Sequence, residues 1–430
     1  MLIRGATLLD GTVVDIRVDG TIAAVGADLE TRPGEQVFDA HGRTVIPGLH
    51  DHHVHLHAAA AALTSVRVGP GEVRDRTGLA EALARAPIGG DGWIRAVGYH
   101  EAVAGPLDRA LLDELSPPVP VRVQHRSGVL WTVNTAGLAR LGLADHPDGR
   151  LRSDDHGWSD TLPRNEIPIG DVSRRLAAFG VTGVTDATPD LAPADVAALT
   201  ANSAVLQRVH CLAPGKRILH DTDLDLDALS GWITARHAED IPVAVHCVTA
   251  AQLVVTLAAL QAAGTRPGDR IEHAAIVPDD SLAALAASGA TVVTQPNFVT
   301  ERGDQYLVDV PAAEHRELWR VASLLKAGVP VALSTDTPFG DGDPWAAMRA
   351  AVARTTASGP VLGADERVSP RAALTMFLGT AEHPARRRVI APGAPADLVL
   401  LDGSPAEVLD ALDAGLVAAT LVAGRPVFVR

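Results

Sequence analysis

The stretch Thr44-Val45-Ile46-Pro47-Gly48-Leu49-His50-Asp51-His52-His53-Val54-His55 begins as an apolar run and ends in clustered imidazoles. Alternate residues of an extended chain project to the same side, so we expect His53 and His55 to reach one point together while Val54 points away. Two imidazoles at this spacing form half of a metal site. A solvent-facing histidine-rich loop is the competing interpretation, and ligands on other strands would decide between the two.

Polar residues also end three later apolar segments. Val243-Ala244-Val245-His246 and Arg270-Ile271-Glu272-His273 each finish in an imidazole, and Val331-Ala332-Leu333-Ser334-Thr335-Asp336 finishes in a carboxylate. The carboxyl ends of parallel strands meet at one rim of an α/β barrel, so these side chains should converge with the first histidine pair. Histidine and aspartate suit Zn²⁺ best, and Mn²⁺, Fe²⁺ or Co²⁺ less selectively.

The order of strands and helices predicts the fold class. Between about residues 46 and 387, strand-like runs alternate with Ala/Leu-rich helical segments, which is typical of parallel βα units. We therefore predict an α/β fold, with a (β/α)8 TIM-like barrel over 46–387 and an insertion around 90–165. Both termini contain short strands and tight turns, and neither is long enough to bury its own core. We expect 1–45 and 388–430 to form one small β-sandwich domain.

Composition narrows the partners and the compartment. The 430 residues carry a formal net charge of −15, which disfavours binding to nucleic-acid phosphates. No apolar tract approaches the ~20 residues of a membrane span, so no membrane partner is expected. The first residues lack the apolar region of a signal peptide, and two cysteines, Cys211 and Cys247, suit a reducing compartment. We expect a cytoplasmic protein, with a monomer and a homodimer both open.

Lysine is rare in this chain. Of the 37 basic residues only Lys216 and Lys326 are lysines. Lys326 ends a predicted helix before a glycine, where a cation favours the helix dipole. Lys216 begins a strand of the predicted barrel, and a charged ammonium near divalent ions is unfavourable, so a neutral amine is expected. Such an amine can add carbon dioxide to give a carbamate that bridges two metals. The alternative is a solvent-exposed lysine in a Pro-Gly turn.

Taken together, the motifs resemble the amidohydrolase superfamily, and within it the branch called amidohydrolase family 3, similar to N-substituted formamide deformylases. The resemblance runs nearly from end to end. It rests on Pro47-Gly48-x-x-Asp51-x-His53-x-His55, Val245-His246, Arg270-Ile271-Glu272-His273, Gln295-Pro296, Asp336-x-Pro338 and Pro392-Gly393-x-x-Ala396-Asp397-Leu398. It implies a barrel, a β-sandwich built from both termini and a centre of one or two metal ions.

The resemblance also implies a role for each ligand. His53 and His55 would bind one ion and His246 and His273 the other. A carboxylated Lys216 would bridge the two ions. Asp336 would bind the first ion and act as general base and then general acid. The implied reaction is hydrolysis of a C–N amide-type bond in a formamide, an N-acyl compound or a cyclic amide, by a metal-activated hydroxide.

Two other functions stay open. One is a mononuclear deaminase on the same scaffold. Deaminases of this superfamily resemble one another in placing a Glu three residues after the fifth-strand histidine, where this chain has Thr249. Glu272 precedes His273 by one residue, so it should face the opposite side of its strand and not replace that acid. The other is a catalytically silent scaffold, which metal binding would exclude.

Residues that contact the small-molecule substrate are harder to predict. The candidates are Tyr99, His100, His125 and Arg126 in the expected insertion, and Asn297 and Trp345 after the last two strands. An imidazole or a phenol there would stabilise a tetrahedral oxyanion, although hydrogen bonding within the insertion explains these residues equally well. The substrate itself depends on loop conformations and does not follow from the sequence.

Overall fold

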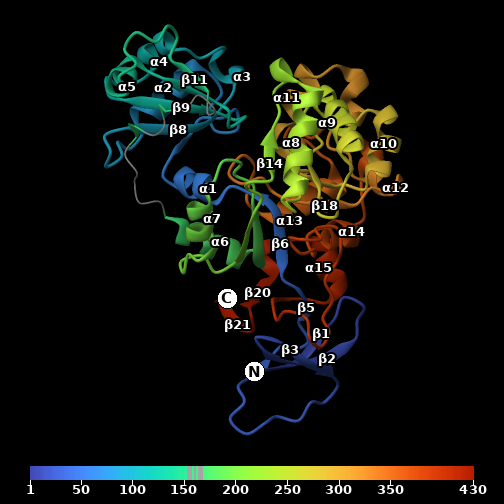
Figure 1. Ribbon diagram of the computed structural model, residues 1–430. Helices are drawn as coiled ribbons and strands as arrows, with labels where there is room; N and C mark the ends of the chain where they lie inside the picture. Colours follow the sequence, from blue (N-terminus) through green and yellow to red (C-terminus); the bar gives the residue numbers. More distant parts are fainter. Residues whose placement is uncertain (153–156, 159–160, 163–167) are drawn as a thin grey trace. The chain divides into compact units, whose positions relative to one another are not determined.

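The computed structural model describes residues 1–152, 157–158, 161–162 and 168–430 (Figure 1). It contains two compact units. The first consists of Met1–His55 and Gly170–Arg430, and the second of Leu56–Ile169. The insertion expected around 90–165 is thus part of a longer unit, which begins directly after the His-x-His pair.

Parallel strands of the first unit form the frame of the predicted site. Within the described residues, three of these strands make the sheet β13-β12-β6 and five make the sheet β14-β15-β16-β17-β18. Their bounds are β6 Leu49–Val54, β12 Val181–Asp186, β13 Arg208–Cys211, β14 Lys216–Ile218, β15 Ala244–Cys247, β16 Arg270–His273, β17 Thr291–Thr294 and β18 Val331–Leu333. The α/β class with parallel strands is confirmed, and the described strands form two sheets rather than one closed sheet.

Backbone hydrogen bonds place the end of β18 beside the end of β6. The N–H of His55 donates to Thr337 O at 2.9 Å, and the N–H of Asp336 donates to His53 O at 3.0 Å. The first histidine pair and Asp336 therefore lie next to each other although they are far apart in the sequence.

Helices between these strands begin and end at residues with clear local reasons. Thr249 starts α9 (Ala250–Ala263) with a capping box, in which its side chain and that of Gln252 satisfy each other's backbone N–H groups. The other α-helices of the first unit are α6 Ile169–Ala178, α7 Pro193–Thr200, α8 Leu226–Ala238, α10 Leu282–Ser288, α11 Asn297–Asp309, α12 Ala322–Lys326, α13 Pro344–Ala353, α14 Pro370–Thr375 and α15 Pro405–Ala411. Thr249 is thus tied to the start of a helix.

Strands from both termini share one mixed sheet, in the order β21-β20-β19-β5-β1-β2-β3, with β4 paired to β1. The bounds are β1 Leu2–Thr7, β2 Val13–Asp19, β3 Thr21–Gly26, β4 Val37–Asp39, β5 Thr44–Pro47, β19 Leu398–Leu401, β20 Val417–Val422 and β21 Arg425–Val429. β5 pairs antiparallel with β19, with Val45 opposite Leu400, and both side chains are buried in the core of this sheet. Because β5 leads through Gly48 into β6, the terminal sheet is directly continuous with the first histidine strand.

The second unit has its own sheet and core. Its strands lie in the order β11-β10-β9-β8-β7, with bounds β7 Val66–Arg67, β8 Ile94–Tyr99, β9 Val121–His125, β10 Leu130–Val133 and β11 Arg150–Arg152. Its helices are α1 Leu56–Leu63, α2 Arg76–Ala84, α3 Glu101–Ala104, α4 Arg109–Leu115 and α5 Thr135–Arg140. Leu79, Ile94, Leu112 and Val121 are buried together there. Across the described parts of both units, every helix is too short or too polar to cross a membrane.

Candidate metal centre

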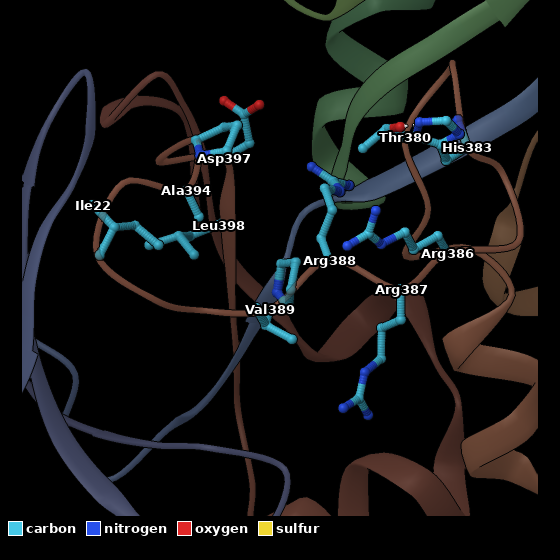
Figure 2. A pocket seen from close by; sticks show the side chains of 12 residues that line it. Ile22, Thr380, His383, Arg386, Arg387, Arg388, Val389, Ala394, Asp397 and Leu398 are labelled. Atoms are coloured by element: carbon cyan, nitrogen blue, oxygen red, sulfur yellow. Dashed lines mark hydrogen bonds between the residues drawn. The ribbon is translucent and has the colours of Figure 1, made fainter.

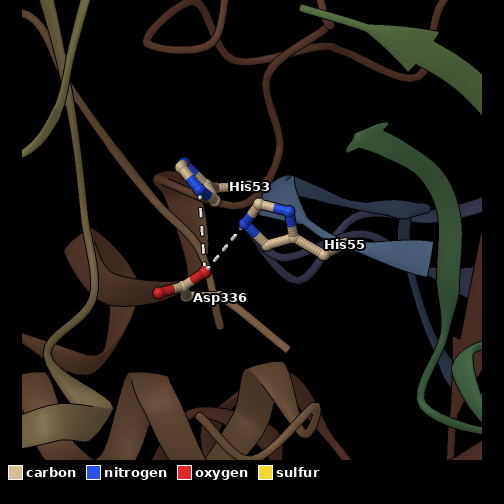
Figure 3. Close-up of side chains that lie close together, drawn as sticks. All are labelled: His53, His55 and Asp336. Carbon is tan, nitrogen blue, oxygen red and sulfur yellow. Dashed lines mark ion pairs between the residues drawn. The ribbon is translucent and has the colours of Figure 1, made fainter. Parts of the chain in front are cut away.

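Three side chains at the ends of β6 and β18 face one point (Figure 3). Asp336 Oδ1 lies 3.6 Å from His53 Nε2 and 3.5 Å from His55 Nε2. This oxygen is buried, and among the described residues it has no hydrogen-bond partner. Two imidazole nitrogens and a carboxylate oxygen within 4.8 Å of one another are a suitable donor set for a divalent ion.

The two remaining predicted histidines adjoin this group. The ring centroid of His273 lies 4.7 Å from that of His53 and 4.5 Å from that of His246. Burial lowers the pKa of His246 to about 3 and holds the pKa of His273 well below its usual value. Both imidazoles are therefore neutral, which is the form that binds metals.

Two of these residues leave their strands in a left-handed conformation. His273 has a φ of 69° and Asp336 a φ of 58°. Non-glycine residues adopt this conformation at a cost and hold it where neighbours fix it, often at functional sites. Asp51 fixes the backbone just before Asp336, because its carboxylate accepts hydrogen bonds from the Thr335 N–H at 3.1 Å and from the Thr335 hydroxyl at 2.5 Å.

Lys216 is buried at the start of β14. Lys216 is only 6% exposed, and its Nζ has no hydrogen-bond partner among the described residues. Burial lowers the pKa of Lys216 to about 8. β14 pairs with β15, with Lys216 opposite Ala244, two residues before His246. Burial and, after it, the charge of Lys216 lower the pKa values of His53 and His246. The alternative of a solvent-exposed turn lysine is wrong.

Glu272 contacts His53, a predicted metal ligand, which the expectation of a side chain on the opposite side of the strand did not anticipate. It is fully buried, its Oε2 contacts His53 Nδ1, and its Oε1 accepts a hydrogen bond from Arg270 Nε at 2.7 Å. Strand alternation did place Glu272 opposite to the next residue, but His273 leaves the regular strand and turns back to the site. Glu272 accepts the Nδ1–H of His53 and so leaves His53 Nε2 free of a proton.

Gln295 has the equivalent role for His273. Its Oε1 lies 2.8 Å from His273 Nδ1, and its Nε2 donates to Ser334 Oγ at 2.8 Å. This arrangement makes the amide oxygen the acceptor, so that His273 also carries its proton on Nδ1. Asp51, Glu272 and Gln295 all belong to the sequence motifs, but their spacing along the chain does not indicate this supporting role.

The substrate candidates of the second unit have local partners. The Tyr99 hydroxyl donates to Gly105 O at 2.6 Å, and its side chain lies in the core of that unit. His100 Nδ1 accepts the Ala102 N–H at the start of α3, and His125 Nε2 lies 3.1 Å from Glu101 Oε2. The Arg126 N–H donates to Tyr99 O at 2.8 Å. These contacts bring the four predicted residues together within their own unit.

Asn297 and Trp345 both belong to the first unit. Trp345 is fully buried and donates its indole N–H to Phe179 O at 2.8 Å, so it offers no surface to a substrate. Asn297 is 2% exposed and donates to Thr335 O at 3.1 Å, just before Asp336. Phe339, which the sequence did not single out, places its ring 5.2 Å from that of His55.

Comparisons with known proteins give a family match, two related enzymes and a solved structure of similar fold. Residues 36–428 match the model of the amidohydrolase family. N-substituted formamide deformylase from Arthrobacter pascens is 25% identical over 90% of this chain and 89% of its own length. Imidazolonepropionase from Halobacterium salinarum is 29% identical over 77% of this chain and 71% of its own. An uncharacterized metal-dependent hydrolase from Pyrococcus horikoshii OT3 superposes with a TM-score of 0.72 at 19% identity, covering 94% of this chain and 97% of that one.

Proposed function

Because the chain belongs to the amidohydrolase family and is a hydrolase of carbon–nitrogen bonds, we propose that it cleaves a formamide, an N-acyl or a cyclic amide bond. The observation that carries this proposal is the meeting of His53, His55 and Asp336 at the ends of two neighbouring strands. The relative named as a formamide deformylase, which aligns over most of both chains, supports the amide class.

The residues of the cluster fit a centre of one or two divalent ions, for which Zn²⁺ is our first choice. His53, His55 and Asp336 would hold one ion, and His246 and His273 the second. The buried Asp336 Oδ1 and Lys216 Nζ support this assignment, because polar atoms left without partners at such depth are costly. Bound divalent ions supply a hydroxide nucleophile at neutral pH and polarise the scissile carbonyl.

We assign Lys216 as a carboxylated bridging residue. Its neutral amine would attack carbon dioxide, form an N–C bond and release one proton, which leaves a carbamate with a single negative charge. The burial of Lys216 near His53, His246 and His273 supports this assignment. The positive charge of the ammonium is unfavourable beside these histidines, and carboxylation would replace it with a negative charge.

Asp336 is the proposed catalytic residue. In this role it accepts a proton from the attacking water and delivers it to the leaving nitrogen. Its place at the end of β18, fixed by Asp51 through Thr335 and by Asn297, holds the carboxylate in one position for both transfers.

Deamination has less support, because it needs an acid to protonate the ring nitrogen and neither candidate position supplies one. Thr249 caps α9 and donates its hydroxyl to Asp221 Oδ1 at 2.8 Å. Glu272 is occupied by Arg270 and His53. Neither residue is a proton donor for a ring nitrogen, whereas amide hydrolysis needs only the Asp336 shuttle.

Two finer points of architecture belong to the same proposal. We infer a closed (β/α)8 barrel over 46–387, because β18 already contacts β6 through backbone hydrogen bonds. We also infer a β-sandwich built from 1–45 and 388–430, because β5 and β19 pair directly. Both cysteines are free thiols, which supports a cytoplasmic location.

A substrate panel tests the function. Metal-stripped protein would be reconstituted with Zn²⁺ or Mn²⁺ and incubated with N-formyl amines, N-acyl amino acids, cyclic amides and aminated heterocycles. We expect formate or another carboxylate to appear from at least one amide. Ammonia release from cytosine-, adenine- or guanine-like rings, with no amide cleaved, would replace the proposal by deamination. Protein that takes up no metal would be a silent scaffold.

A further inference from the structure

A cavity of about 270 Å³ lies in the first unit, at the other end of β6 from the histidines (Figure 2). Pro47, which precedes β6, lines it, whereas His53 lies near the C-terminal end of that strand. His53 lies five positions after Gly48 along an extended chain, which corresponds to roughly 16 Å. A ligand in this cavity would therefore not touch the metal centre.

The walls of the cavity are of two kinds. Ile22, Pro47, Ala394 and Leu398 supply an apolar wall from the terminal sheet and its connections. The consecutive residues 386–388, all arginines, supply a basic wall. Three arginines thus line one small cavity with an apolar wall, in a chain whose net charge is −15.

The positive charge of this wall is largely uncompensated. Asp397 is the acid of the lining, but it is 2% exposed and already pairs with Arg208, whose Nε lies 2.7 Å from Asp397 Oδ2. The guanidinium of Arg388 donates to Gly48 O and Leu378 O. The side chains of Arg386 and Arg387 are exposed and, within the described part of the chain, form no hydrogen bond or ion pair.

We propose that this cavity binds a small amphipathic anion, with its carboxylate, sulfonate or phosphate group on Arg386 and Arg387 and its apolar body against Ile22, Pro47 and Leu398. Guanidinium groups match such anions in charge and in planar hydrogen-bond geometry. An apolar body of a few carbons would gain by leaving water at the opposite wall. The volume of about 270 Å³ suits a ligand of the size of one substituted ring.

Thermal unfolding of the metal-loaded full chain tests the proposal. Benzenesulfonate, which combines an anion with an apolar ring and is a weak metal ligand, would be compared with sulfate and with benzyl alcohol at constant ionic strength. We expect benzenesulfonate at millimolar concentration to raise the Tm by about 2 to 4 °C, since a ligand that binds only the folded state stabilises it. Sulfate and benzyl alcohol should each raise it less. Benzoate and phenyl phosphate, titrated in parallel, identify the preferred head group.

Two double variants separate this cavity from other anion sites. R386Q/R387Q should lose the benzenesulfonate shift, and both side chains are exposed, so the variant should fold. R74Q/R425Q removes the same charge from two other exposed arginines that form no side-chain hydrogen bond within the described residues, and it should keep the shift. A shift that persists in R386Q/R387Q, a shift that sulfate alone reproduces, or the absence of any shift in the unaltered chain would each overturn the proposal.

Discussion

Each unit of the molecule brings two imidazoles and a carboxylate together within 4.8 Å. The sets are His53, His55 and Asp336 in the first unit and His100, Glu101 and His125 in the second. The first set is buried or half-buried, whereas the acid of the second is exposed. By composition alone the two sets would be equal candidates for a metal.

The two sets differ in the hydrogen-bond partners of the ring nitrogens that point away from the cluster. In the second unit, His100 Nδ1 accepts the Ala102 N–H at 3.2 Å and His125 Nδ1 accepts the Ser127 N–H at 3.1 Å. A neutral ring that accepts on Nδ1 carries its proton on Nε2, the nitrogen that faces Glu101. In the first unit His53 donates from Nδ1 to Glu272 and keeps Nε2 free. The outer partner of His53 thus leaves its Nε2 available to a metal, whereas the backbone N–H groups that His100 and His125 accept place their protons on Nε2.

The largest effect should come from removing each histidine pair in turn. H53A/H55A should lose at least one ion per chain and all measurable turnover, because the ion loses two of its three donors. H100A/H125A should keep the full metal content. Elemental analysis after dialysis of both variants gives the answer, and equal metal loss in the two would refute the distinction drawn between the clusters.

Lys216→Ala should reduce turnover by about 100-fold, since the proposed bridge between the ions is removed. Short carboxylic acids such as acetate should restore part of the rate by standing in for the carbamate. Lys326→Ala is the matched control, because Lys326 is exposed at the end of α12 and is the second lysine of the chain. The assignment fails if Lys216→Ala retains full activity, or if carbon dioxide removal leaves the rate unchanged.

Glu272→Leu should weaken metal affinity by about 10- to 100-fold, since His53 loses the acceptor that fixes its tautomer. Glu272→Gln retains an acceptor oxygen and should weaken affinity by only a few-fold. Competition with a chelator measures both, with circular dichroism to verify folding because Arg270 loses its partner. Glu101→Leu, in the second cluster, should have no effect on affinity. Equal losses in the Leu and Gln variants would contradict a tautomer-fixing role.

The smallest effect concerns the pH dependence of stability at Glu101. Partial burial raises the pKa of this carboxyl, but a backbone hydrogen bond and the adjacent His125 outweigh burial and hold the pKa below its ordinary value of 4.5. A depressed pKa contributes stability above that ordinary value, and the contribution is lost as the pH falls through the folded-state pKa. An exposed pair of this kind contributes about 0.2 to 1 kcal/mol.

The Tm difference between the unaltered chain and Glu101→Gln should therefore shrink as the pH falls below 4.5. Thermal unfolding followed at several pH values measures it. A difference that grows as the pH falls would show that the sign of this linkage is wrong.

Sequence patterns predicted the strand ends well because alternation and the shared rim of parallel strands are local and topological rules. These rules led to His53, His55, His246, His273 and Asp336, which the structure brings close together. Glu272 was misjudged because its partner His53 lies on a strand 219 residues away and because the left-handed turn at His273 has no sequence signal. The second unit begins at Leu56, before the insertion expected around 90–165, and its first elements are the short α1 and β7.

The net charge of the chain did not predict the local charge of its surface. The net charge of −15 is correct for the whole chain, but it does not reveal the basic run Arg386-Arg387-Arg388, which was not singled out from the sequence. The run becomes informative only when the fold places Ile22 and Leu398 at the same cavity. Local charge is a property of the folded surface, and counting residues along the chain does not reveal it.

The position of the second unit has an evolutionary consequence. The segment Leu56–Ile169 begins directly after β6 and ends before β12. These two strands pair in parallel, with His50 opposite Gly183. The unit has its own core and interrupts no strand of that pairing. We therefore expect exchange of this segment between homologous genes to leave the pairing of β6 with β12 intact.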